Sequence, residues 1–477
     1  MWLGGDHRLR PEVASGLSPY RVAAGPRSSV PLGSCTASSP SQRSWDAMGR
    51  ALEAWRDDAS DASAEGIRER LRAFAGLAPD APIVLTPSGT DAIYVVSTLG
   101  LCGASRVHHV VVGASELGGG TVDASEGKSI TGLPPRGALA LGAPVEGLGG
   151  HCSAEPIYLR GPLGARIDSD EVDGAVAARV RASVAPGTTV VLHLVAHSKT
   201  GLRAPSTATA SALHSELGSR LLVLVDAAQG RLAPHDIRQA LDLGFAVLFT
   251  GSKFYSGPPF SGALFLPSRL AGDPGALPPG LENWLTAADL PGHWRRARRS
   301  LSGVVNQGLL LRWEGALAEI EAYHAIDARR RAGVYHTFAG AVHEVVGPAP
   351  SLVLDGPLPP VHSLVTGLGA YPSVYGFQVQ GPKGVLGAAE LKRLHASLDT
   401  DREAVDSALA GAYHLGQPVV LGPPHPHAPA VLRLALGGRL VTDLALTPDC
   451  GGLWMRTTLG KVRDKIDALL ARGGGAP

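Results

Sequence analysis

Short runs of consecutive apolar residues alternate with stretches of helical pattern between residues 81 and 266. Apolar runs without polar alternation are typical of strands buried on both faces, as in a parallel sheet covered by helices. Strands are predicted within Ala81–Gly89, Arg106–Glu116, Thr189–Ser198, Ser219–Gln229 and Phe245–Lys253, with helices over Thr90–Leu101 and Ser206–Gly218. The expected fold class is therefore α/β, a mostly parallel sheet with helices on both faces.

The pattern differs on either side of this region. Residues 1–43 are irregular, and a helical pattern then runs from Ser44 to Gly76. Beyond Arg299 the predicted elements are a long helix that could break near Gly333, an alternating strand, an amphipathic helix and a further strand, at Leu309–Val342, Ser373–Gly381, Gly387–Leu398 and Ala430–Gly438. We predict a large domain over 56–310, a smaller α+β domain over 311–477, and an N-terminal segment over 1–55 that packs on the small domain or on a partner subunit.

Composition narrows the class of protein. The chain has 477 residues, 44% of them apolar and 18% charged, and its net charge of +1 gives no general reason to expect binding to nucleic acid or to an anionic membrane. Neither a signal-peptide core nor an apolar run of about 20 residues is seen. The four cysteines have neither zinc-site spacing nor the density of a disulfide framework, so we expect no metal site and a cytoplasmic location.

Polar residues gather where the predicted strands end. In chain order these are Ser88-Gly89-Thr90-Asp91, His197-Ser198, Asp226 with Gln229, and Thr250 with Ser252 and Lys253. Open parallel sheets bind their ligands at the carboxyl ends of the strands. The sequence therefore predicts that these four groups meet at one edge of the sheet.

Three of these groups suggest complementary chemistry. The Ser88–Asp91 turn opens a helix, where backbone N–H groups and hydroxyls bind phosphate, although the same residues also suit a simple helix cap. Asp226 ends a strongly apolar strand, and Lys253 follows the next one. A phosphate cradle, a carboxylate and a lysine amine are the three groups that pyridoxal phosphate requires. Taken singly, Asp226 could cap a turn and Lys253 could extend into solvent.

The motifs "TPSGTDA", "HSKTG", "VDAAQGRLAPHDI" and "FTGSKFYSGPPFSGALFL" span most of the predicted large domain. In these motifs the chain resembles the fold type I enzymes that depend on pyridoxal 5'-phosphate. It looks most like the class V aminotransferase group, which includes cysteine desulfurases and kynureninases.

The resemblance implies Lys253 as the Schiff-base lysine and Asp226 as the partner of the pyridine nitrogen. It further implies that Gln229 and Ser198 contact the cofactor's 3-oxygen. The phosphate would lie in the turn with Ser88 and Asp91, held by Gly89, Thr90, Thr250 and Ser252. The resemblance also implies Arg433 as the candidate for binding the substrate carboxylate. The alternative is that Arg433 is an ordinary arginine at the end of an edge strand.

Some positions depart from the family pattern. Glu116 and Leu117 stand where the family often places a ring that stacks on the cofactor. Val304 stands where a threonine often reaches the other subunit's phosphate, so Asn306 could take that role in the homodimer that the resemblance implies. No cysteine lies between Cys152 and Cys450, which argues against a desulfurase that uses a cysteine on a small-domain loop.

The leading functional hypothesis is an aminotransferase acting on a small amino acid, and the alternative is a lyase or decarboxylase that uses the same cofactor. Two hypotheses from other classes compete with these. "SEGK" at Ser125–Lys128 and "KTG" at Lys199–Gly201 imitate two elements of serine β-lactamases, but they lie too close together in the sequence for that fold. The second of these hypotheses is a noncatalytic protein of the same fold, and the presence of Lys253 argues against it.

Overall fold

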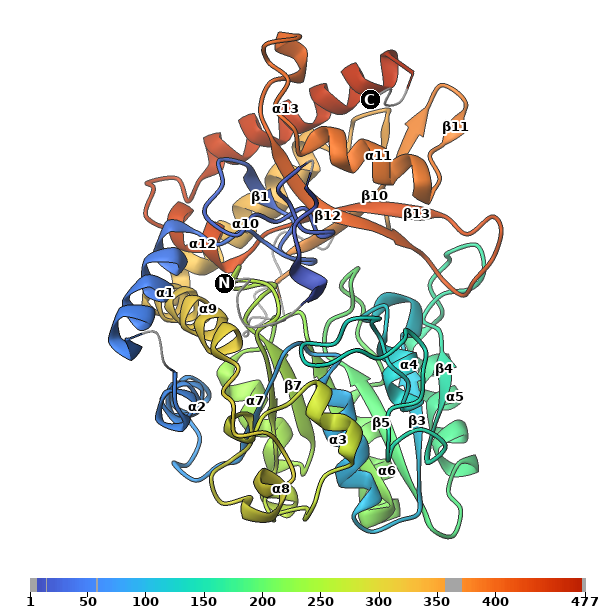
Figure 1. The fold of residues 1–477 in the computed structure, drawn as a ribbon. Helices are drawn as coiled ribbons and strands as arrows, with labels where there is room; N and C mark the ends of the chain where they lie inside the picture. Colours follow the sequence, from blue (N-terminus) through green and yellow to red (C-terminus); the bar gives the residue numbers. More distant parts are fainter. Residues whose placement is uncertain (1–6, 14, 57–58, 357–370, 474–477) are drawn as a thin grey trace.

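The computed structural model describes residues 7–13, 15–56, 59–356 and 371–473. The described chain forms two sheets, which lie one above the other in Figure 1. The larger has the order β2-β8-β7-β6-β5-β3-β4. Its strands are β2 (Ile83–Thr86), β3 (Arg106–Val112), β4 (Cys152–Ile157), β5 (Thr188–Val195), β6 (Leu221–Ala227), β7 (Ala246–Thr250) and β8 (Gly262–Phe265). All run in one direction except β8, which is antiparallel to both of its neighbours, so the mostly parallel sheet is confirmed.

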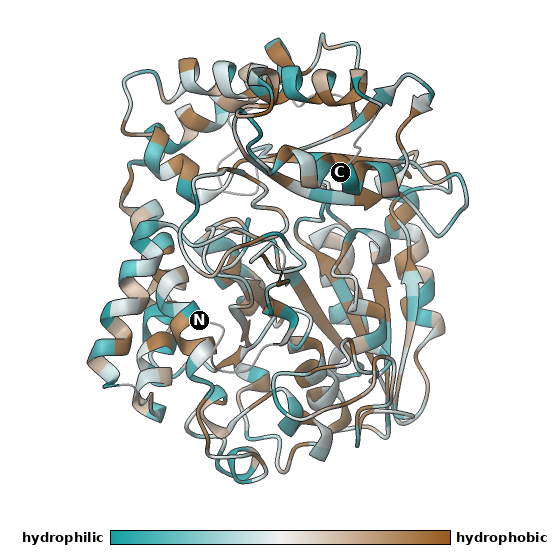
Figure 2. Ribbon diagram, turned by 45° about the horizontal axis from the view of Figure 1, so that its top comes forward, coloured by the Kyte–Doolittle hydropathy of each residue, from teal (hydrophilic) through white to brown (hydrophobic). Residues whose placement is uncertain are grey.

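Helices cover both faces of the large sheet. They are α2 (Asp61–Ala75), α3 (Ala92–Leu101), α4 (Thr121–Ser125), α5 (Ser169–Ala182), α6 (Thr207–Leu217), α7 (Pro234–Asp242) and α8 (Arg295–Arg299). Along β6, Val223 and Val225 belong to one apolar core, whereas Leu222 and Leu224 belong to a second core on the other face. This is why the strand has no polar alternation, and Figure 2 shows the central strands as mostly hydrophobic. Each such buried side chain contributes about 1.5–3 kcal/mol of transfer free energy.

The second sheet has the order β1-β12-β13-β10-β11, and β9 pairs with β10. Its strands are β1 (Val30–Leu32), β9 (Leu352–Leu354), β10 (Val374–Gly381), β11 (Gly384–Val385), β12 (Tyr413–Val420) and β13 (Ala430–Ala435). The accompanying helices are α1 (Gln42–Trp55), α9 (Gln307–Ala325), α10 (Ala328–Val345), α11 (Ala388–Leu398), α12 (Gly438–Leu444) and α13 (Gly452–Ala471). Short 3₁₀ turns occur at His7–Leu9, Ala114–Glu116, Gly218–Arg220, Ser268–Leu270, Pro279–Asn283, Ala287–Asp289 and Ser407–Leu409. Among the described residues, no helix combines the length and apolar character needed to cross a bilayer.

The long helix predicted over Leu309–Val342 is two helices, and the predicted break near Gly333 is wrong. The chain leaves the helix after Ala325, and Asp327 caps α10 by accepting from the N–H groups of Arg329 and Arg330 at 2.9 and 3.3 Å. Gly333 lies inside α10, where a Cβ atom would be 3.0 Å from the sulfur of Cys450. The glycine therefore permits a close approach between segments instead of ending a helix.

The helical pattern over Ser44–Gly76 likewise divides into α1 and α2. Arg56 ends α1 in the left-handed conformation, with φ of 51°, and its N–H donates to the carbonyls of Leu52 and Glu53. The periodicity continues across this break because both helices pack one apolar side against neighbours, so the pattern alone did not show it.

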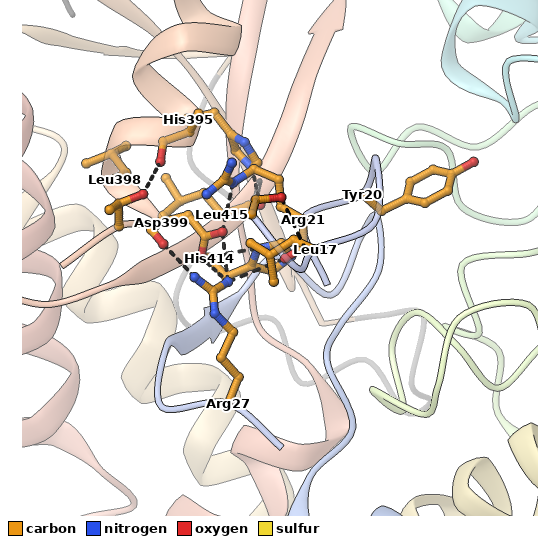
Figure 3. A network of polar contacts seen from close by, with 12 residues as sticks. Leu17, Tyr20, Arg21, Arg27, His395, Leu398, Asp399, His414 and Leu415 are labelled. Carbon is orange, nitrogen blue, oxygen red and sulfur yellow. Dashed lines mark hydrogen bonds and ion pairs between the residues drawn. The ribbon is translucent and has the colours of Figure 1, made fainter. Parts of the chain in front are cut away.

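The N-terminal segment, residues 15–41, lies between the two sheets and joins the second one. Its strand β1 pairs in parallel with β12, from the far end of the chain. Arg21 and Arg27 donate to the buried carboxylate of Asp399 at 2.9 and 2.8 Å, and His414 lies 3.6 Å from it (Figure 3). Burial by itself raises the pKa of Asp399, but His414 and Arg27 outweigh it and lower that pKa to about 2.

We predict that Asp399→Asn releases the N-terminal segment. The amide cannot balance two arginines, so the free energy of unfolding should fall by about 3–5 kcal/mol, the range seen when one partner of a buried ion pair is removed. Limited proteolysis should cut within residues 15–41 faster than in the parent. The exposed Asp242→Asn is the control and should leave the cleavage rate unchanged. Equal rates in all three proteins would show that Asp399 does not hold the segment.

Two histidines are buried side by side in the large sheet. His109 Nδ1 lies 3.0 Å from His193 Nε2, and His109 Nε2 lies 3.0 Å from the hydroxyl of Ser97. Burial lowers the pKa of His193 to about 4, and burial together with the neighbouring histidines lowers that of His109 well below its usual value. Both rings are therefore neutral in the folded protein at pH 7.

This pair should make folding stability depend on acidity. The unfolded chain takes up protons near pH 6.5 that the folded pair does not, so stability should fall as the pH decreases from 7 toward 4, by roughly 1.4 kcal/mol per pH unit for each proton. The double variant His109→Leu/His193→Leu should show a shallower slope in urea unfolding between pH 7 and 5. His427→Gln, an exposed control, should keep the parent slope.

Candidate active site

Asp226 and Lys253 are brought together by two neighbouring strands. Strands β6 and β7 pair in parallel, with Asp226 opposite Leu248, and Lys253 follows β7 by three residues. Both side chains line one cavity of about 500 Å³, a size typical of small-ligand sites. The expectation that these two strand ends lie side by side is confirmed.

Asp226 and Lys253 shift each other's pKa. Asp226 is buried, and its Oδ1 accepts from the N–H of Ala228 at 3.0 Å. Burial raises the pKa of Asp226, while Ala228 and Lys253 oppose that shift. Burial lowers the pKa of Lys253, and Asp226 opposes this, whereas Arg433 adds to it. The Lys253 amine has no hydrogen bond or ion pair with any residue that the structure describes, so it is available to react.

The turn before α3 can hold an anion. Ser88, Gly89 and Thr90 line the cavity, and the N–H groups of Gly89 and Thr90 donate to none of the described residues. They lie at the start of a helix of 10 residues, whose dipole favours negative charge. Thr250 and Ser252 line the cavity from the end of β7. At Gly89 a Cβ atom would lie 2.9 Å from Leu248, so glycine lets the turn pack closely on the sheet.

Arg433 enters the same cavity from β13 of the second sheet. It is buried, and its guanidinium donates to the carbonyls of Gln417 and Lys199 and to the hydroxyl of Thr36, at 2.8–3.2 Å. No carboxylate among the described residues pairs with it. Its charge is therefore held in place by neutral groups and remains available to an anion.

Four predicted residues do not line the cavity and make other contacts. Asp91 accepts from both terminal nitrogens of Arg8, at 3.2 and 2.8 Å. Ser198 donates to Glu116 at 2.5 Å, and the amide of Gln229 donates to the carbonyl of Cys35 at 3.1 Å. Asn306 caps α9 by accepting from the N–H of Leu309. Their suggested roles toward a cofactor stay predictions.

The loop after β3 brings glycines to the cavity where the family often places a stacking ring. Gly118, Gly119 and Gly120 line it, and a Cβ atom on Gly118 would be 2.8 Å from Thr90 Oγ1. Glu116 is turned away and binds Arg160 and Ser198. The rings found among the described lining residues are those of Tyr20 and Phe260, whose centroids are 5.6 Å apart. Tyr20 points away from the Asp399 network in Figure 3.

Several lining residues were missed at the sequence level. Cys35, Thr36 and Tyr20 come from the irregular N-terminal segment, which has no local pattern that would place it. Lys199 follows β5 within the motif "HSKTG", so its position just after a predicted strand could have identified it as a lining residue. Ser125, the serine of the β-lactamase comparison, lies at the end of α4 and does not line the cavity. A separate cavity of about 570 Å³ beside α5, α6 and α7 contains none of the predicted site residues.

Comparison with known proteins identifies the fold. No protein-family model and no curated protein sequence matches the chain. Solved structures do match. The cysteine desulfurase CsdA from Escherichia coli has a TM-score of 0.54 at 14% identity, with 93% of this chain and 95% of that chain covered. The cystine C–S lyase C-DES, in complex with its product cysteine persulfide, has a TM-score of 0.53 at 13% identity, with 94% and 98% covered.

A cysteine desulfurase from Thermococcus onnurineus NA1 has a TM-score of 0.52 at 13% identity, with 92% of this chain and 95% of that chain covered. This chain has the fold type I architecture. In each comparison the match extends over nearly the whole of both chains, so the fold includes the second sheet as well as the large one. At these identities the likeness establishes the fold, while chemistry must be argued from the site.

Proposed function

We propose that the protein binds pyridoxal 5'-phosphate and acts as a lyase on a small amino acid. The observation that carries the proposal is the meeting of a lysine amine, a carboxylate and a helix-start anion cradle in one cavity. The cavity supplies a donor set for each part of this cofactor. Ser88, Gly89 and Thr90 suit its phosphate, Asp226 suits its ring nitrogen, and Lys253 suits its aldehyde.

The chain's own residues have distinct tasks. When bound, pyridoxal phosphate supplies an aldehyde that joins an amino group and a ring that draws electrons from the bonds at Cα. Lys253 would hold the aldehyde until the substrate amine displaces it, and would then move the proton at Cα. Asp226, as a buried carboxylate, would keep the ring nitrogen protonated. Arg433 would orient the substrate through its carboxylate.

The lyase is preferred to the aminotransferase that the sequence suggested. A neighbour of this fold is described as a cystine C–S lyase in complex with cysteine persulfide, and others are described as cysteine desulfurases. Fold analogy supports a proposal of this kind without deciding it. Cys35 lines the cavity, so a cysteine is present at the site even though none lies between Cys152 and Cys450 in the sequence.

A panel of amino acids incubated with the cofactor-loaded protein tests the proposal. Pyruvate, ammonia or sulfide released without a keto-acid acceptor supports the lyase. Amino transfer that requires an acceptor would restore the aminotransferase hypothesis. A protein that takes up no cofactor, shown by the absence of a visible absorption band that borohydride bleaches, would overturn both. The homodimer stays a prediction, which light scattering of the purified protein would check.

A further inference from the structure

Lys199 is a second amine in the cavity, and the proposed reaction gives it no task. Its N–H donates to the carbonyl of Glu116 at 2.9 Å, and its own carbonyl accepts from Arg433 at 3.2 Å. Its backbone is therefore fixed beside the guanidinium. Its side chain lines the cavity and has no hydrogen bond or ion pair with any of the described residues.

The carboxylate of Glu116, which acts on the charge of Lys199, is already occupied. One oxygen of Glu116 accepts from Arg160 at 2.6 Å, and the other accepts from the hydroxyls of Ser198 and Thr200. Arg160 is buried and also pairs with Asp355 at 2.7 Å. Glu116 is thus committed to a separate ion-pair network, and its effect on the pKa of Lys199 is smaller than the opposing effects of burial, Arg433 and Lys253.

The charges that line the cavity do not balance. Lys199, Lys253 and Arg433 are basic, whereas Asp226 is the acidic residue among the described lining residues. Arg8 is also present, but Asp91 pairs with it. Burial lowers the pKa of Lys199 to about 8, and Arg433 and Lys253 act in the same direction. A cation taken out of water without a partner is unfavourable, and an anionic ligand group would remove that cost.

The proposed function uses most of these groups. In that proposal Lys253 and Asp226 would engage the cofactor, the cradle before α3 would hold its phosphate, and Arg433 would bind the substrate's α-carboxylate. Lys199 is then left beside Arg433 with no counter-charge. We infer that Lys199 binds a second acidic group on the substrate, so that the site selects amino acids with an anionic side chain. This inference rests on the proposed function and specifies its substrate class.

Calorimetry with simple carboxylates tests this without relying on turnover. Succinate carries two carboxylates and propionate one, and each is titrated into the purified, cofactor-loaded protein. We expect succinate to bind at least tenfold more tightly than propionate, because a charge-assisted hydrogen bond adds that much or more. Lys199→Gln should weaken succinate about tenfold and leave propionate within about twofold. Lys199→Arg, which keeps the charge, should retain part of the preference.

The controls separate this inference from the proposed function. Lys383→Gln, at an exposed lysine, should bind both carboxylates as the parent does. Equal affinities for succinate and propionate in the parent, or an equal loss of both in Lys199→Gln, would overturn the inference. Absence of a borohydride-fixed cofactor on Lys253 would overturn the proposed function instead. Unchanged thermal midpoints and an unchanged cofactor band in Lys199→Gln would show that the fold and the cofactor site are intact.

Discussion

Replacing Lys253 with alanine is expected to abolish covalent attachment of pyridoxal phosphate and to reduce turnover at least about 1000-fold, because the amine that holds the aldehyde also moves the proton. The anion cradle at Ser88–Thr90 remains, so the variant should still bind the cofactor without a covalent link. The measurement is mass spectrometry of the borohydride-reduced protein, together with turnover of the substrate that the amino-acid panel identifies.

Lys199, the second amine in the cavity, allows a further test of whether Lys253 carries the cofactor. Lys199 and Lys253 line the same cavity, and Lys253 contributes to lowering the pKa of Lys199, so both amines are candidates for reaction with an aldehyde. Peptide mapping of the reduced parent should place the label on Lys253. A label on Lys199, or a label that persists in Lys253→Ala, would contradict the assignment. Lys128→Ala, at an exposed lysine paired with Glu126, is the control and should keep both label and turnover.

Asp226→Asn is expected to lower turnover by on the order of 100- to 1000-fold while leaving the protein folded and loaded. An amide oxygen can still accept from the N–H of Ala228, so the local hydrogen bond survives. An amide cannot balance a protonated ring nitrogen, and that loss is the reason for the lower rate. The cofactor's absorption band should shift, because the protonation of the ring changes.

Stability separates a role in the reaction from a role in folding. Burial raises the pKa of Asp226, so its charge is unfavourable in the folded protein at pH 7 and its removal should not weaken the fold. We expect the free energy of unfolding to change by less than about 1 kcal/mol. Turnover within tenfold of the parent would exclude Asp226 as the partner of the ring nitrogen. A large fall in stability would instead show that the carboxylate is structural.

The break between α9 and α10 shows which features the local sequence predicts and which depend on contacts between distant segments. Asp327 carries a capping signal in the sequence, but the apolar pattern continues through it and gave the wrong boundary. Gly333 resembled a break, yet it serves packing against Cys450, from a segment far along the chain. A contact between distant segments leaves no periodic trace near either residue, so the sequence could not distinguish the two glycine roles.

By itself, the sequence determined the parallel sheet and the meeting of Asp226 with Lys253. Apolar runs without alternation identify strands that are buried on both faces, and parallel strands end at the same edge. Only the tertiary structure decided the far wall of the cavity, where Cys35 and Thr36 meet Arg433, and the position of Lys199 beside that arginine. Those contacts join the N-terminal segment, the loop after β5 and strand β13, and their proximity depends on how the two sheets pack together.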